Sequence, residues 1–204
     1  MTTLKRVQQI AVERAAVQRL IVTGGTARSP MPGVEVRPLT THRDDRGTLT
    51  ELLRADWTDV FGDDLPFAQA YVSYTRTGVA RDDGRWHVHQ RQTDRFVCLA
   101  GRLVVPIADA REDSPTRGSL VLVELSAESD APAPMMVTVP PGTLHGLIAV
   151  GEGLSVLMNL PTRLYDASDE GRVAFADAGV EVAPGLPFGF ELLRRHYGVP
   201  PDRA

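Results

Sequence analysis

Residues 86–94 read WHVHQRQTD, a segment that carries His87, His89 and Asp94 close together. Residues two apart in an extended strand lie on the same face, so both imidazoles point in one direction. Farther along, residues 140–145 read PPGTLH, which supplies His145 directly after a tight turn. We therefore expect three imidazoles and one carboxylate to converge in one pocket of a β protein.

The chain around this segment has the pattern of an all-β domain. Short runs rich in apolar and β-branched residues cover positions 67–74, 95–105, 120–125, 136–139 and 154–160. Glycine, proline and aspartate interrupt them at 81–84, 113–115 and 140–142. Because no helix is indicated between these runs, the spacing predicts a jelly roll.

The two ends of the chain differ from this middle part. Residues 2–23 have apolar positions near helical spacing before Gly24-Gly25, which predicts an amphipathic helix that is an appendage. Residues 27–33 have the composition of a linker, and a short helix is predicted over 190–196. We expect an N-terminal helix and linker over 1–32, a barrel over 33–183 and a C-terminal tail over 184–204.

Bulk composition argues against several classes of function. The chain has 204 residues, of which 43% are hydrophobic and 24% charged, as expected of one globular domain. A net charge of −4 and the lack of a basic cluster argue against nucleic acid as a partner. No apolar stretch approaches the roughly 20 residues of a membrane helix, and no secretory signal is recognisable, so we expect no membrane partner and a cytoplasmic location. The single cysteine, Cys98, lies in an apolar run and is expected to be a buried thiol.

The two histidine segments resemble the paired motifs of the cupin superfamily, HxH…E…G followed by PxGxxH, with Asp94 at the usual position of glutamate. The resemblance implies a cupin-type jelly-roll β-barrel. In metal-dependent cupins the three histidines and the acid bind a divalent cation. The resemblance therefore implies a possible site for iron, manganese, nickel or zinc on His87, His89, Asp94 and His145.

A narrower resemblance, over residues 33–183, is to the dTDP-4-dehydrorhamnose 3,5-epimerase family, itself built on a cupin barrel. Several blocks agree at once: DDRGTLTE at 44–51, FAQ at 67–69, ADAR at 108–111, SPTRG at 114–118, LSAE at 125–128 and PPGTLHG at 140–146. The resemblance implies an epimerase or isomerase of a nucleotide-linked 4-keto-6-deoxy sugar that requires no cofactor. It also implies a homodimer formed by strand exchange.

The same resemblance implies residues that contact the substrate. Arg46, Glu51 and Gln69 would bind the nucleotide, and Arg81 would hold a diphosphate or sugar oxygen. Tyr165 either stacks on the base or sugar or is an ordinary aromatic residue at the rim of the barrel.

The catalytic candidates are His87, His89, His145 and Asp109. His87 or His89 would be the base, because a neutral imidazole with a pKa of about 6.5 can remove a proton made acidic by an adjacent ketone. Asp109 either orients a group in the pocket or only ends its strand.

Three features depart from the family pattern. The family's catalytic tyrosine aligns with Met158 or Asn159, and its usual lysine aligns with Asp94, which would raise the pKa of a neighbouring histidine. The C-terminal segment that bears the carboxylate partner of the base is not recognisable. The acid that returns the proton is therefore unassigned.

The sequence leaves three functions open. The first is the nucleotide-sugar epimerase, and the second is a metal-dependent cupin enzyme, either an isomerase or an oxygenase. The third is a ligand-binding cupin without turnover, for which ligand-induced stabilisation without chemistry would be the signature.

Overall fold

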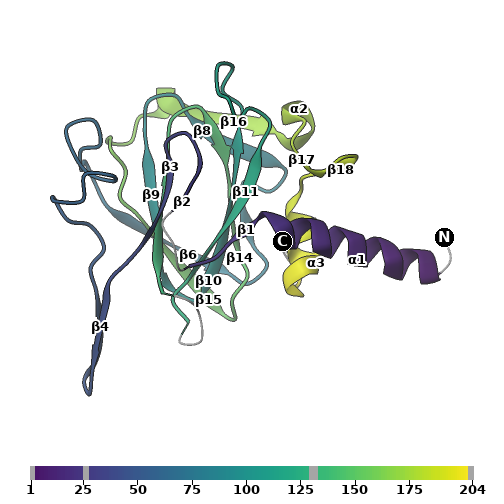
Figure 1. Cartoon of the computed structure of the whole chain (residues 1–204), viewed down its shortest axis with the longest axis horizontal. Coiled ribbons are helices and arrows are strands. Elements are labelled where there is room, and N and C mark those ends of the chain that lie inside the picture. The colour runs from purple at the N-terminus through teal and green to yellow at the C-terminus, as the bar shows by residue number, and fades with distance from the viewer. Residues whose placement is uncertain (1–2, 25–27, 129–132, 202–204) are drawn as a thin grey trace.

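The computed structural model describes residues 3–24, 28–128 and 133–201, and two β-sheets make up most of it (Figure 1). The first sheet runs in the order β1 (Ile21–Val22), β11 (Leu120–Ser126), β10 (Arg102–Asp109), β13 (Thr143–His145), β8 (Arg85–His89) and β16 (Glu170–Ala174). Strand β14 (Leu147–Ala149) pairs with both β10 and β7 (Ala80–Arg81). The second sheet runs β2 (Arg28–Met31), β3 (Val34–Pro38), β12 (Met135–Val139), β9 (Asp94–Ala100), β15 (Leu154–Asn159) and β6 (Tyr71–Arg76).

The remaining elements lie outside these two sheets. Strands β4 (Thr41–Asp44) and β5 (Gly47–Thr50) form a hairpin that extends away from the body of the molecule (Figure 1). Strands β17 (Glu181–Ala183) and β18 (Leu186–Pro187) form a second hairpin. The helices are α1 (Thr3–Leu20), α2 (Phe175–Ala178) and α3 (Phe190–Tyr197), with a 3-10 turn over Ala167–Asp169.

The two sheets face each other across an apolar core, which confirms the predicted all-β jelly-roll fold. Phe96 of β9 packs in one cluster with Ile107 of β10 and Val137 of β12. Val97, the next residue of β9, lies on the opposite face in a separate cluster with Leu160. This alternation follows from the two-residue period of a strand, and it also determines which side chains reach the space between the sheets.

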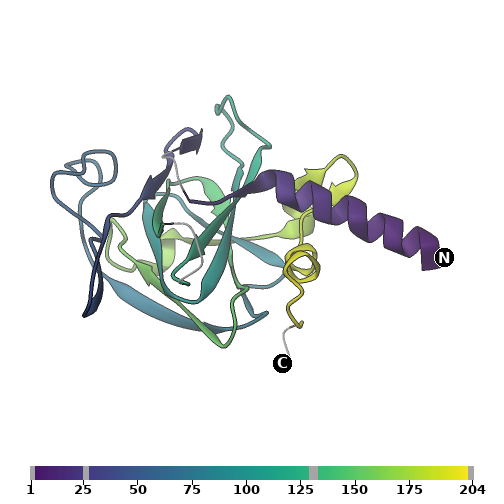
Figure 2. The same ribbon diagram turned by 60° about the horizontal axis from the view of Figure 1, so that its bottom comes forward.

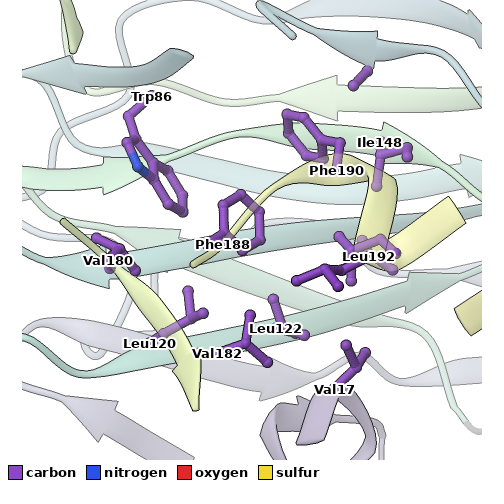
Figure 3. Packing of buried hydrophobic residues seen from close by; sticks show 14 of the residues in the cluster. Val17, Trp86, Leu120, Leu122, Ile148, Val180, Val182, Phe188, Phe190 and Leu192 are labelled. Atoms are coloured by element: carbon purple, nitrogen blue, oxygen red, sulfur yellow. The ribbon is translucent and has the colours of Figure 1, made fainter. Parts of the chain in front are cut away.

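The outer face of the first sheet is covered by the C-terminal segment. Trp86 is fully buried there, and its ring stacks on Phe188 with the centroids 4.5 Å apart (Figure 3). Phe190 packs against Phe188 at a centroid separation of 5.6 Å. Because these rings belong to the core, residues 184–201 are part of the folded body rather than a separate tail. The short helix predicted over 190–196 is α3.

Helix α1 is attached to the same face and is not an appendage. It ends at Leu20, earlier than predicted, because Ile21–Val22 forms strand β1 parallel to β11. Val17 is fully buried, and Arg14 donates hydrogen bonds to the backbone carbonyl of Arg195 in α3, beside which α1 passes (Figure 2). Neither α1 nor another helix in the described ranges is long and apolar enough to cross a membrane.

The segment predicted as a linker, residues 27–33, contains strand β2. Residue 27 lies outside the described residues, but Arg28–Met31 pairs with β3, and Gly33 occupies the turn between them with a φ of 79°. Such a positive φ favours glycine. A domain boundary at residue 33 would therefore divide a hairpin of the second sheet.

Arg95 fixes the loop that leads into the site. Its side chain is fully buried and donates hydrogen bonds to the backbone carbonyls of Val60, Leu65, Pro66 and Leu160. A buried guanidinium is tolerated when its donors are satisfied. These bonds hold the chain just before the segment that carries Gln69 and Tyr71.

Candidate active site

Three histidines meet on the inner face of the first sheet. Strands β8 and β13 are neighbours, and their register places His145 opposite His87. The ring centroid of His87 lies 4.5 Å from that of His89 and 5.0 Å from that of His145. Trp86 and Val88, the alternate residues of β8, belong to the outer core, so the two histidines of the HVH sequence point inward. The structure brings together the imidazoles that the sequence predicts to converge.

Two adjoining cavities lie beside the histidines. The first has a volume of about 200 Å³, and its lining includes Tyr71, Arg81, His87, Asp94 and His145. The second, of about 360 Å³, includes Gln69, Tyr71, His87, Tyr165 and Glu170. Because Tyr71 and His87 line both cavities, a bound molecule that extends through the two spaces would pass these side chains.

Asp94 is the buried acceptor of the cluster. Its Oδ1 accepts hydrogen bonds from Gln92 Nε2 and Asn159 Nδ2, each at 2.8 Å. Its Oδ2 lies 3.4 Å from His145 Nε2 and 3.5 Å from His89 Nε2. Burial raises the pKa of Asp94, but the adjacent His145 and His89 outweigh this effect, and the pKa is lowered overall. The carboxylate therefore stays charged and anchors the histidines.

His87 differs from the other two histidines because its Nε2 atom faces Glu170 instead of the buried Asp94. That atom lies 3.2 Å from Glu170 Oε2 but forms no hydrogen bond. Burial, together with the imidazoles of His145 and His89, lowers the pKa of His87 to about 3. Asp94 raises this pKa, as expected from the sequence, but only enough to offset a small part of the shift. The ring is neutral at pH 7, which is the form that accepts a proton.

Glu170 is a site residue that the sequence analysis missed. It accepts a hydrogen bond from Arg172 at 3.0 Å, and the Nε of Arg172 lies 2.9 Å from Asp82 Oδ2. Asp82 belongs to the turn before β8, where it has a φ of 56°, a strained value for a residue other than glycine. The spacing of Glu170 and Arg172 was the available signal, because residues two apart on a strand share a face.

His89 is held on both sides of its ring. Its Nδ1 lies 3.2 Å from the carbonyl oxygen of Asp169, and its Nε2 lies 3.1 Å from Gln92 Nε2. The Asp169 carboxylate accepts the backbone N–H groups of Gln90 and Gln92, each at 3.0 Å. These contacts fix the loop after β8 and leave His89 less free than His87 to meet a ligand.

Three of the predicted substrate contacts lie at the cavities. Gln69 and Tyr165 line the larger one, with Tyr165 70% exposed at its edge. Arg81 lines the smaller one, and its guanidinium donates to Thr75 Oγ1 at 3.2 Å and to the backbone carbonyl of Tyr74 at 2.9 Å.

The other two predicted contacts, Arg46 and Glu51, do not reach the cavities of their own chain. Arg46 lies on the β4–β5 hairpin with its side chain 85% exposed and paired with Asp44. The carboxylate of Glu51 is paired with Arg54 at 2.6 Å. Within one subunit, neither residue is placed to bind a molecule beside His87.

The prediction of a catalytic role for Asp109 requires correction. Its carboxylate accepts hydrogen bonds from the Arg111 guanidinium and from the hydroxyls of Ser114 and Thr116. These bonds, with that of Arg111 foremost, lower the pKa of Asp109. These bonds satisfy both carboxylate oxygens, so Asp109 stabilises the turn that follows β10. Asp109 also lies outside the lining of both cavities.

The histidine cluster has the donor atoms that a divalent transition metal needs. One ring nitrogen from each of His87, His89 and His145 lies within 4.8 Å of the other two. Nε2 of His87 and Nε2 of His145 are buried without a hydrogen-bond partner. Imidazole nitrogens bind such metals at about 2.1 Å, and three of them can occupy three positions around one ion. The cluster comprises the histidines alone, without the predicted Asp94, whose Oδ1 already accepts two hydrogen bonds.

Sequence comparisons relate the chain to sugar epimerases. The family model for dTDP-4-dehydrorhamnose 3,5-epimerase matches residues 28–188. The probable low-salt glycan biosynthesis epimerase of Haloferax volcanii is 39% identical over 137 residues, which cover 67% of this chain and 81% of that protein. A spore coat polysaccharide biosynthesis protein of Bacillus subtilis is 32% identical over 147 residues, which cover 71% of this chain and 90% of that protein.

A solved structure gives the same relationship. The dTDP-4-dehydrorhamnose 3,5-epimerase of Bacillus anthracis, crystallised with TDP and PPi bound, matches with a TM-score of 0.62 at 25% identity. The match covers 72% of this chain and 81% of that one. The family model spans every strand of the two sheets except β1, and it includes the three histidines. The chain therefore belongs to the dTDP-4-dehydrorhamnose 3,5-epimerase family and is a carbohydrate epimerase.

Proposed function

We propose that this chain epimerises a nucleotide-linked 4-keto-6-deoxy sugar and that His87 is the base that removes the proton. One observation carries the proposal. His87 lines both cavities, and its Nε2 makes no hydrogen bond and has the Glu170 carboxylate 3.2 Å away. A hydrogen on the carbon beside a ketone is acidic because the enolate places charge on the ketone oxygen. A neutral imidazole within reach can therefore remove it.

The contacts of the two strand histidines favour His87 over His89 as the base. Both ring nitrogens of His89 already face protein groups, at 3.2 Å and 3.1 Å. Nε2 of His87 makes no hydrogen bond, and the Glu170 carboxylate 3.2 Å away can stabilise the imidazolium formed when the proton is accepted. His89 would then be a positioning residue that keeps the loop after β8 in place.

Arg81 supplies positive charge near the reacting carbon. Its Nε and Nη2 atoms are held by Thr75 and Tyr74, whereas Nη1 makes no hydrogen bond among the described residues. A held guanidinium with a remaining donor can bind a sugar or diphosphate oxygen without reorganising.

The larger cavity is our candidate for the nucleotide. Gln69 offers an amide for hydrogen bonds to a base, and the exposed ring of Tyr165 offers a surface on which a base can stack. The bound TDP and PPi of the Bacillus anthracis relative support a ligand of this class.

The proposal includes a homodimer in which the β4–β5 hairpin of one subunit completes the site of the other. Arg46 on this hairpin has no role in its own subunit beyond the pair with Asp44. The outer face of the second sheet exposes Val72, Leu99 and Leu154 by 45%, 40% and 53%. A second subunit that covers this face would bury an apolar surface and bring its hairpin with it.

A metal-dependent reaction is the second candidate, and the cluster of His87, His89 and His145 favours it. A divalent metal held there would polarise a carbonyl oxygen of the substrate. Metal analysis of the purified protein, before and after dialysis against a chelator, separates the two candidates. Exchange activity that survives removal of the metal supports the metal-free reaction.

Proton exchange tests the proposed function directly. The protein is incubated with dTDP-4-keto-6-deoxyglucose in deuterium oxide, and the C3 and C5 proton signals are followed by NMR. We expect at least one signal to disappear with the unmodified protein and with His196→Gln, a histidine variant on α3 outside the site. His87→Ala should abolish the loss. Persistence of both signals with folded unmodified protein would exclude the reaction on this sugar.

A further inference from the structure

Tyr71 stands on the opposite side of the cavities from the proposed base. It belongs to β6 of the second sheet, whereas His87 belongs to β8 of the first. Both side chains line both cavities. A molecule between the two sheets would therefore meet the His87 side chain from one sheet and the Tyr71 side chain from the other.

The buried side chain of Asn159 determines how the Tyr71 hydroxyl is used. Asn159 is fully buried on β15, directly opposite Tyr71 in the strand register. Its Oδ1 accepts the backbone N–H of Arg95 at 3.1 Å, which fixes the orientation of the amide group. Nδ2 must then face the other way, and it lies 2.8 Å from both Tyr71 Oη and Asp94 Oδ1. The two amide hydrogens are used by these two acceptors.

The Tyr71 oxygen is consequently an acceptor in its contact with Asn159. Its own hydrogen has no acceptor among the described residues, although the ring lines both cavities. A phenol held by a donor on one side, with its O–H available on the other, can give a proton to a bound molecule. The same Asn159 N–H would stabilise the phenolate left behind.

We propose that Tyr71 is the acid that delivers a proton to the substrate carbon on the face opposite His87. This role rests on the proposed function. His87 takes the hydrogen of the C–H bond as a proton, and the electron pair of that bond forms the enolate. The enolate carbon then forms a new C–H bond with the phenol proton of Tyr71. His87 returns its proton to water and the phenolate takes one from water, so the cycle closes without another reactant.

The other hydroxyls of the cavities fit this role less well. Ser73 lines the smaller cavity, but an aliphatic hydroxyl is a far weaker acid than a phenol. Tyr165 lines only the larger cavity and is 70% exposed, against 48% for Tyr71, so water competes more strongly for its proton. Tyr71 is the phenol that is held by a buried group and also lies where the two cavities join.

The test separates removal of the proton from its return. Tyr71→Phe and Tyr74→Phe are compared with the unmodified protein on dTDP-4-keto-6-deoxyglucose in deuterium oxide. Tyr74 is the matched control, because it lies on the same strand with its side chain on the outer face. Exchange at C3 and C5 is followed by NMR, the epimeric product is quantified after chemical reduction, and thermal unfolding checks the fold.

For Tyr71→Phe we expect exchange within a few-fold of the unmodified rate, while formation of the inverted product falls by about 100-fold. Tyr74→Phe should match the unmodified protein in both. The role of Tyr71 is overturned if its variant forms the inverted product at the unmodified rate, or if exchange falls together with the product. Absence of exchange in the unmodified protein would overturn the proposed function itself and this role with it.

Discussion

His87 Nε2 lies 3.2 Å from Glu170 Oε2, and this contact joins two strands that are neighbours in the first sheet. Glu170 is held in turn by Arg172, which contacts Asp82 in the turn before β8. A carboxylate beside a base stabilises the imidazolium that forms when the base accepts a proton. This chain of contacts makes Glu170 a positioning residue for the proposed base.

Replacing Glu170 with Gln keeps the shape of the side chain and removes its charge. We expect kcat for epimerisation to fall by about 100-fold, because the imidazolium loses its partner, while KM changes by less than about 3-fold. Steady-state kinetics measure both. Glu152→Gln, in the exposed turn before β15, is the control and should behave as the unmodified protein. A rise in KM with unchanged kcat would instead mean that Glu170 binds substrate.

Asp109 is predicted to be required for stability and not for the reaction. Asp109→Asn removes the charge that Arg111, Ser114 and Thr116 contact, and it places an amide donor against other donors. We expect a loss of about 2 kcal/mol in the free energy of unfolding, seen as a melting temperature lower by about 6 °C. Exchange activity per folded molecule should be unchanged. Lost activity at an unchanged melting temperature would restore the catalytic interpretation.

The parts of the site that the sequence predicts are those fixed by local geometry. His87 and His89 share a face because a strand has a two-residue period, and the turn before His145 is marked by proline and glycine. Glu170 and Asn159 were missed because they join the site through pairing of β16 with β8 and of β15 with β9. The spacing of Glu170 and Arg172 indicates that these two side chains share a face, but the sequence does not show which strand lies beside them.

Two errors of the sequence analysis have local causes of a different kind. Asp109 follows a strand and precedes a polar turn, and the sequence does not show that the hydroxyls of that turn satisfy its carboxylate. The segment before Gly33 has the composition of a linker, yet Arg28–Met31 pairs with β3. Backbone pairing needs no particular side chains, so composition alone misplaced the domain boundary.

Cys98 should be unreactive in the folded protein. Burial raises the pKa of this thiol from 9.0 to about 11, so very little thiolate is present at pH 8. The stabilisation from the buried neutral thiol is fully present below pH 9 and is lost as the pH rises toward 11. In that range the thiol ionises in the unfolded chain but not in the folded one, which favours unfolding. We expect no reaction with Ellman's reagent at pH 8 in buffer and complete reaction in denaturant. Rapid reaction of the folded protein would contradict the buried position.

The proposed homodimer implies a link between assembly and substrate binding that a surface substitution can break. Leu154→Asp places a charge on the outer face of the second sheet, and we expect monomers in analytical ultracentrifugation where the unmodified protein is a dimer. Val12→Asp, at a residue of α1 that is 66% exposed, is the matched control and should remain dimeric. The Leu154→Asp monomer should show a KM for the nucleotide sugar raised by at least about 10-fold, because it lacks the partner's Arg46. If the Leu154→Asp monomer keeps the normal KM, each subunit binds the nucleotide alone. If the unmodified protein itself sediments as a monomer, the dimer is excluded.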